Sequence, residues 1–156
     1  MEANMNKKIL ATDKVNNKVY ICDETLSHMK AHPDVELNDI RKAINNISLS
    51  GTFFMESVDL HETVGKDHCV FVPEDKRKEI KMVQRPNREG LTPMIDMEPQ
   101  NTSLVTVGLC VDDDGLWTMF TAFYGVKAPK EPWDQSLTDS EKQESEEFWT
   151  THALCM

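Results

Sequence analysis

The 156-residue sequence lacks the features that mark several large classes of protein. No apolar run approaches the roughly 20 residues that cross a bilayer as a helix, so we expect no contact with a membrane. The first residues include lysines but no apolar segment of the kind found in secretory signals. The cysteines stand far apart, without the paired spacing of a zinc site or a disulfide framework: Cys22, Cys69, Cys110 and Cys155. These absences favour a reduced chain in the cytoplasm.

Motifs for common cofactors and nucleophiles are also missing from the sequence. There is no glycine-rich dinucleotide loop, no nucleotide phosphate loop, no G-x-S-x-G nucleophile turn, no C-x-x-C pair and no H-E-x-x-H. We therefore predict no cofactor and no metal, and chemistry would have to come from dispersed polar side chains.

Basic residues are scarce in the last third of the chain. The whole sequence carries 27 acidic and 17 basic residues, a formal net charge of −10, and residues 96–156 alone contribute 12 acidic and 3 basic ones. By contrast, residues 76–88 hold six basic residues and one acidic residue. A strongly acidic chain does not attract nucleic acid as a whole, although a local basic arm could do so. The acidic end instead suits a basic protein surface.

The centre of the predicted sheet is a hairpin in the segment from Leu104 to Tyr124. Two apolar runs, Leu104–Val111 and Leu116–Tyr124, flank an Asp-Asp-Asp-Gly turn, and an Asp-Gly turn between strand-forming runs is a strong hairpin signal. Both runs are apolar on successive residues, as is typical of strands covered on both faces.

The segments before the hairpin predict short strands and two helices. A helix is expected over Glu24–Ala31 with Asp23 as its N-cap, and a second helix follows Pro33 with an apolar stripe that includes Ile40, Ala43, Ile44 and Ile47. Strands are predicted at 8–12, 18–22, 52–58 and 69–72, a charged strand or extended arm at 76–85, and a long loop at 86–102.

Thr138 and Glu141 form a capping box that predicts a C-terminal helix reaching about Ala153. Its outer side is acidic, and Phe148, Trp149 and Leu154 are expected to dock it. We predict a single α+β domain over residues 1–156, with a core at about 8–125 and an acidic C-terminal appendage at about 126–156.

Several polar residues stand where they could act on a phosphate. His61 lies in a loop that also contains Lys66, and its imidazole could move a proton near neutral pH. Arg85 and Arg88 flank Pro86 and could bind a phosphate. Thr121 on the central strand could orient one. The structural alternatives are a polar turn residue, a solvated charged arm and a hydroxyl that satisfies nearby backbone groups.

His28 and His32 lie four residues apart on the first predicted helix, a spacing that places both on one face. This spacing permits a metal site, but it lacks an acidic or cysteine partner. The simpler interpretation is a pair of surface histidines near a helix C-terminus.

Three segments together resemble a known family. ETLSHMKAHPDV, GTFFMESVDLHETVGKDHCVFV and WTMFTAFYG are similar to parts of the barnase–EndoU–colicin–RelE group, chiefly its phage-associated, colicin-D-like branch, over about Val19–Gly125. The resemblance implies N-terminal helices packed on an antiparallel sheet of four or more strands, and a metal-independent ribonuclease. His28 matches the helix histidine of that group, Thr121 its late-strand hydroxyl and His61 a loop candidate. Lys66, Arg85 and Arg88 are added as substrate-binding residues from their charge.

Three functional hypotheses remain open from the sequence. The first is this ribonuclease, which would bind RNA. The second is a non-catalytic protein-interaction module of the same fold, phage- or toxin-associated, whose acidic end meets a basic protein. The third is a metal-dependent hydrolase that uses His28, His32 and another ligand. Active toxins of the group are commonly basic, so the charge of −10 departs from their pattern and makes the second hypothesis a serious rival of the first.

Overall fold

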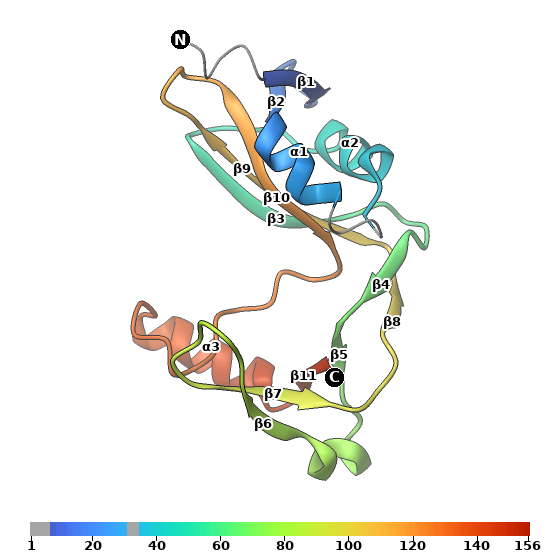
Figure 1. Ribbon diagram of the computed structural model, residues 1–156, viewed down its shortest axis with the longest axis vertical. Helices are drawn as coiled ribbons and strands as arrows, with labels where there is room; N and C mark the ends of the chain where they lie inside the picture. The colour runs from blue at the N-terminus through green and yellow to red at the C-terminus, as the bar shows by residue number, and fades with distance from the viewer. Residues whose placement is uncertain (1–6, 31–34) are drawn as a thin grey trace. The chain divides into compact units, whose positions relative to one another are not determined.

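The computed structural model describes residues 7–30 and 35–156, which divide into two compact units (Figure 1). The first unit comprises Met1–Gly65 and Asn101–Lys127, and the second comprises Lys66–Gln100 and Ala128–Met156. Each unit is thus built from two separate stretches of chain. The sequence predicts one domain with an acidic appendage, whereas residues 128–156 share a compact unit with residues 66–100.

The first unit contains a five-stranded sheet with the predicted hairpin inside it. The strand order is β1 (Lys7–Thr12), β2 (Lys18–Cys22), β10 (Trp117–Tyr124), β9 (Leu104–Val111) and β3 (Phe53–Asp59). The β2–β10 pair is parallel and the other three are antiparallel. Gly115 has φ of +76°, a conformation that glycine adopts at little cost, and it closes the turn between β9 and β10. The predicted hairpin is confirmed, and it lies at the centre of this sheet.

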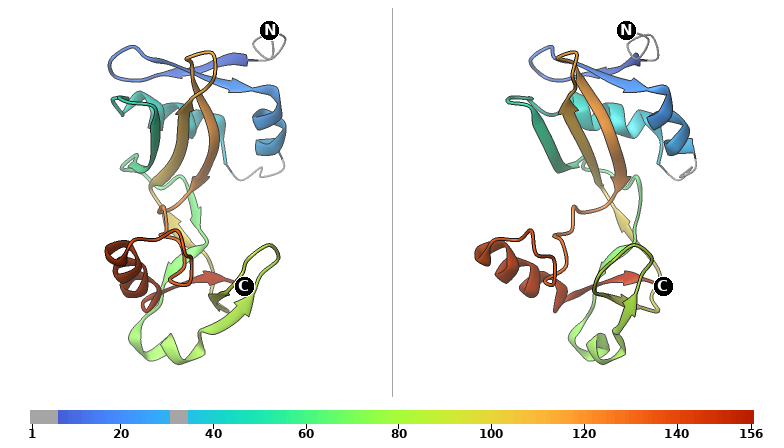
Figure 2. Two further views of the ribbon diagram at one scale, coloured as in Figure 1. Left: turned by 90° about the vertical axis from the view of Figure 1, so that its left-hand side faces the viewer. Right: turned by 60° about the vertical axis from the view of Figure 1, so that its left-hand side comes forward.

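Helices α1 (Asp23–Lys30) and α2 (Leu37–Asn45) lie on one side of this sheet (Figures 1 and 2). The apolar stripe of α2 buries Ile40, Ala43 and Ile44, which share a core with Val105, Val107 and Leu109 of β9, among other residues. The helix therefore forms because its apolar face has a sheet to cover.

The opposite side of the sheet, here called the outer face, follows from the strand register. Side chains alternate between the two faces along a strand, and cross-strand partners share a face. The residues that alternate with the core-facing ones therefore line this side, together with their cross-strand partners. Its members include Ile9, Tyr20, Phe53, Met55, Thr118 and Phe120. Ile9 and Phe53 are more than half exposed.

The second unit is built on a four-stranded sheet with the order β5 (Cys69–Phe71), β11 (His152–Cys155), β7 (Leu91–Ile95) and β6 (Lys81–Gln84). Its small core consists of Val70, Val72, Ile95 and Ala153. Helix α3 (Asp139–Trp149) begins with the predicted capping box of Thr138 and Glu141. A separate two-stranded ladder joins β4 (Gly65–Asp67) to β8 (Gln100–Thr102).

Three local predictions differ from the structure in whole or in part. The predicted loop at 86–102 contains β7 and β8, because β7 gains partners on both sides from β6 and β11. The predicted strand or extended arm at 76–85 is a strand only in β6 (Lys81–Gln84), whereas its first residues belong to a 3-10 helix, η2 (Glu74–Glu79). The C-terminal helix ends at Trp149, and Leu154 belongs to β11, which pairs with β5 and β7.

At the coarse level the fold is as predicted, a mixture of helices and strands with mainly antiparallel pairing. Within residues 7–30 and 35–156, no helix is both long and apolar enough to span a membrane.

Candidate functional site

Thr121, the predicted late-strand hydroxyl, packs against the backbone of the neighbouring strand. It lies opposite Gly108 of β9, just after a register irregularity between Met119 and Thr121. At this irregularity the side chains of Phe120 and Thr121 both lie over Gly108. A Cβ atom at position 108 would lie 2.7 Å from both the Thr121 methyl carbon and the Phe120 ring. Glycine at 108 therefore makes room for both side chains, which gives Thr121 a packing role.

Phe53 and Phe120 form an exposed aromatic pair on the outer face. Their ring centroids are 5.9 Å apart with an interplanar angle of 27°, yet Phe53 is 62% exposed and Phe120 is 41% exposed. Two large apolar rings left in contact with water at adjacent positions are unusual for a surface without a binding partner.

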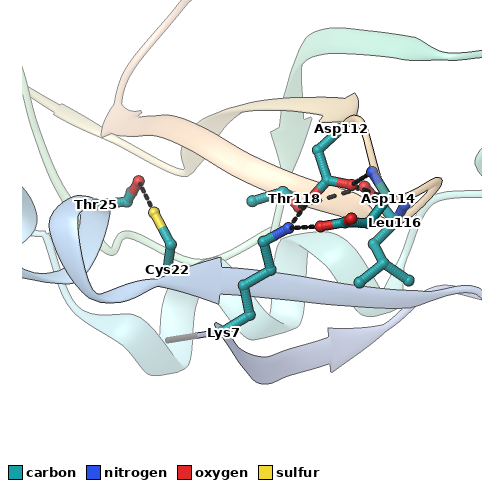
Figure 3. Close-up of polar contacts among 7 residues, drawn as sticks. All are labelled: Lys7, Cys22, Thr25, Asp112, Asp114, Leu116 and Thr118. Carbon is teal, nitrogen blue, oxygen red and sulfur yellow. Dashed lines mark hydrogen bonds and ion pairs between the residues drawn. The ribbon is translucent and has the colours of Figure 1, made fainter. Parts of the chain in front are cut away.

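A charged cluster lies at the hairpin turn, where Lys7 of β1 meets Asp112 and Asp114 (Figure 3). The Lys7 ammonium donates to the Asp112 carboxylate and lies 3.1 Å from Asp114 Oδ2, and the Thr118 hydroxyl donates to Asp112 Oδ2 at 2.9 Å. Burial raises the pKa of Asp112, but hydrogen bonds from Lys7, Leu116 and Thr118 outweigh it and lower that pKa to about 2. The cluster fixes the turn to β1, and the Lys7 ammonium compensates one of the two carboxylate charges.

Cys22 is a residue to which the sequence pattern assigned no chemical role. It lies directly before α1, and its Sγ is 3.2 Å from Thr25 Oγ1 (Figure 3). The Thr25 hydroxyl, together with the Thr25 and Glu24 amides, lowers the pKa of the Cys22 thiol. A thiol at a helix N-terminus commonly has this property. The sequence signal was available, because Cys22 immediately precedes the predicted helix start.

His61 lies in the turn after β3 and points into solvent. Its backbone adopts φ of +60°, its amide donates to Asp59 Oδ1 at 2.8 Å, and its Nδ1 lies 3.7 Å from Asp59 Oδ2. The imidazole side chain is 85% exposed. Nothing around it excludes water, and its contacts are those of a polar turn residue.

The register separates His61 from Thr121. Thr121 lies opposite Gly108, which pairs with Met55, whereas β3 continues for four more residues to Asp59 before the turn to His61. At about 3.3 Å per residue this corresponds to roughly 13 Å along the strand. Proton transfer requires hydrogen-bond reach or one bridging water, so these two residues do not form one catalytic pair in this fold.

The predicted substrate-binding residues belong to the second unit. Arg85 Nη1 lies 3.9 Å from Glu131 Oε1, and the Glu131 carboxylate also accepts a hydrogen bond from the Thr92 hydroxyl at 3.3 Å. Glu131 is buried, so the Arg85 guanidinium compensates an internal charge. Arg88 lies in the turn after Arg85, where its amide donates to the Arg85 carbonyl, and exposed Lys66 lies in β4.

The histidine pair of the metal hypothesis falls at the edge of what the structure describes. His28 lies on α1, but its side chain is outside the described residues, and so is His32 altogether. Among the described residues, no group of three His, Cys, Asp or Glu side chains is arranged to hold a metal ion. All four cysteines are free.

Comparison with known proteins adds a likeness of fold. No family model matches the sequence, and no curated protein matches it. A conserved hypothetical protein from Toxoplasma gondii ME49, known from a crystal structure, has a similar fold with a TM-score of 0.54. The two are 12% identical, and the match covers 77% of this chain and 83% of that one. At this identity the likeness concerns the fold alone.

Proposed function

We propose that the chain is a non-catalytic interaction module whose acidic helix α3 binds a basic protein surface. The observation that carries the proposal is the way α3 presents its acidic side chains. The helix holds one basic residue, Lys142, and five acidic residues, all exposed: Asp139, Glu141, Glu144, Glu146 and Glu147.

The helix is held firmly enough to present these charges as a surface. Its inner side buries Ser145 and Trp149, whose hydroxyl and indole N–H donate to the carbonyls of Lys130 and Pro129, respectively. Phe148 stacks on His152 of β11 with ring centroids 4.0 Å apart. Acidic groups on a fixed scaffold steer a basic partner toward the surface and discriminate against acidic ones.

A metal-independent ribonuclease of the barnase–EndoU–colicin–RelE type is the second candidate, and it rests on the resemblance alone. Such an enzyme would activate a ribose 2′-hydroxyl and needs a base, an acid and a cation near the phosphate. The exposure of His61, its distance from Thr121 and the contact of Arg85 with Glu131 favour the interaction module instead. A phage or toxin association and a cytoplasmic location likewise stay predictions from the sequence.

The interaction module is tested by measuring the binding of an octalysine peptide, the basic probe, by calorimetry at two salt concentrations. The triple variant Glu144→Gln, Glu146→Gln, Glu147→Gln should bind it at least tenfold more weakly than the parent. A control that removes three exposed charges elsewhere, Glu62→Gln, Glu74→Gln and Asp113→Asn, matches the change in net charge. Equal loss in both variants would mean that only net charge matters, and α3 would not be a binding surface.

The enzyme alternative is tested by cleavage of a mixed RNA pool in excess EDTA. The interaction module predicts no cleavage by the parent above that of the His28→Ala and His61→Ala variants. Parent activity that falls by about 10²–10⁴-fold in either variant would establish the ribonuclease and reject the non-catalytic module.

A further inference from the structure

Strand β3 is the last strand of the five-stranded order among the described residues, and its register shows which of its backbone groups point away from β9. The Val111 amide donates to the Thr52 carbonyl and the Leu60 amide to the Ser103 carbonyl, each at 2.9 Å. In an antiparallel ladder the residues that bond the neighbour alternate with residues that point away from it. The even-numbered residues of β3 therefore bond β9, and the outward ones are Phe53, Met55, Ser57 and Asp59.

A contact within the unit shows that this edge accepts hydrogen bonds. Lys127 Nζ donates to the outward carbonyl of Met55 at 3.1 Å. A lysine at an edge strand is a common protection against unwanted pairing. Its flexible side chain is exposed and can be displaced, unlike a covering strand or helix.

The exposed aromatic pair lies at the beginning of this same edge strand. The Phe53 side chain lies on the outer face while its backbone groups point to the edge, and Phe120 stacks against its ring. A strand added beside β3 would place alternate side chains on the outer face, next to the Phe53 ring, which itself stacks on Phe120 of β10. Main-chain bonds would then supply affinity and the aromatic pair would select an apolar side chain, as in other cases of strand addition.

The net charge of the first unit indicates which kind of peptide would bind beside β3. The first unit has 7 basic and 10 acidic residues in 1–65 and 1 basic and 3 acidic residues in 101–127, which gives −5. Glu56 and Asp59 lie on β3 itself, and Glu56 faces the side opposite the aromatic pair. A second copy of the chain would bring like charges together, whereas a basic segment would be attracted.

We propose that the edge of β3 binds an extended peptide segment of another protein as an added strand. Apolar side chains of the peptide lie against Phe53, and alternate lysine or arginine side chains lie toward Glu56. Strand β3 belongs to the first unit and helix α3 to the second, so this proposal stands whether or not α3 binds a basic partner.

The experiment selects dodecamer peptides from a random phage-displayed library on the parent protein and measures the affinity of synthetic copies. Met55→Pro removes an N–H that points to the edge and not to β9, so the internal ladder is kept while strand addition is blocked. Met55→Val is the matched control, and Phe53→Thr removes the aromatic contact. Peptides with alternating apolar and basic residues should lose at least tenfold in affinity for Met55→Pro and for Phe53→Thr, with Met55→Val unchanged.

Hydrogen exchange of the parent gives a second readout that needs no variant to fold. Bound peptide should slow exchange at the amides of Phe53, Met55 and Ser57, and leave the already bonded amides of Phe54, Glu56 and Val58 unchanged. Failure to enrich such peptides, equal binding to Met55→Pro, or no slowing at the outward amides would overturn the proposal. A dimer seen by sedimentation that Met55→Pro abolishes would also overturn it, because a second copy would then be the occupant.

Discussion

The hydroxyl of Tyr124 donates a hydrogen bond to Asp39 Oδ2 at 2.6 Å, which joins the end of the central hairpin to the first turn of α2. The same oxygen accepts a hydrogen bond from the Glu36 amide at 3.1 Å, so it also satisfies a backbone group at the start of that helix. Gly65 lies against the Tyr124 ring, where a Cβ atom would come within 2.2 Å of Cδ2. One side chain thus fixes the position of α2 on the sheet.

Replacing Tyr124 with phenylalanine should destabilise the first unit by about 1–3 kcal/mol, because two polar partners lose their hydrogen bond. Burial and the Asp39 hydrogen bond raise the pKa of Tyr124 to about 12, from a usual value of 10. A raised pKa favours the neutral form in the folded state, so this stabilisation is present below pH 10 and is lost as the pH rises toward 12. Urea unfolding at pH 7 and above pH 10 measures both effects, with Tyr20→Phe as the control.

Asp13→Asn should destabilise the first unit by about 2–4 kcal/mol, so that it unfolds at a lower denaturant concentration. The carboxylate of Asp13 is buried and accepts hydrogen bonds from Val15 and from the backbone and side chain of Asn17, and also from the Leu49 amide at 2.7 Å. An asparagine amide group would place N–H against N–H donors. Asp113→Asn, at an exposed position, should change the midpoint little.

The same carboxylate predicts a dependence on pH. Burial raises the pKa of Asp13, but its hydrogen bonds outweigh this and lower the pKa below 3.8. The stabilisation is therefore present above about pH 4 and is lost as the pH falls below it. Denaturation midpoints between pH 2 and 5 should fall more steeply for the parent than for Asp13→Asn, and parallel curves would contradict the assignment.

Arg85→Met should destabilise the second unit by about 1–3 kcal/mol, since it leaves the buried Glu131 carboxylate without its cation. In a Glu131→Gln background the same change should cost less, because the charge that needs compensation is gone. Thermal unfolding of the parent, the two single variants and the double variant measures this difference, and Arg88→Met is the control. An equal cost in both backgrounds would show that Arg85 does not act through Glu131.

Ala153→Asp should unfold the second unit while the first stays folded. Ala153 is fully buried in β11, which lies between β5 and β7, so a charge there has no partner and disrupts an inner strand. Amide exchange of β9 and β10 should stay slow while that of β7 becomes fast. Simultaneous loss of protection in both units would mean that they unfold together.

Cys22 should react with iodoacetamide faster than the other three cysteines at pH 7.5. The pKa of its thiol is lowered by Thr25, whereas burial, with Asp67 nearby, raises the pKa of Cys69 to about 12. Thiolate is the reactive form, so the order of reaction follows these pKa values. Mass spectrometry of timed samples gives the order, and Thr25→Val should slow Cys22 alone.

Local features of the sequence determined the parts of the fold that depend on neighbouring residues. The Asp-Gly turn between two apolar runs predicted the β9–β10 hairpin, and the Thr138–Glu141 capping box predicted the start of α3, because turn conformation and capping are decided within a few residues. The stripe of α2 was equally clear, since a period of 3.6 residues is visible in one sequence.

Only the tertiary structure decided how distant segments combine. Residues 86–102 look like a loop because of their prolines, glycine and polar residues, yet they hold β7 and β8, whose partners come from as far away as β11. Arg85 and His61 illustrate the same limit for the site. Their charge and type suggested phosphate chemistry, but the Arg85 guanidinium lies beside the buried Glu131 carboxylate, and the His61 imidazole is exposed to solvent. Strand pairing and charge compensation join residues that are remote along the chain, and no local pattern records such a partner.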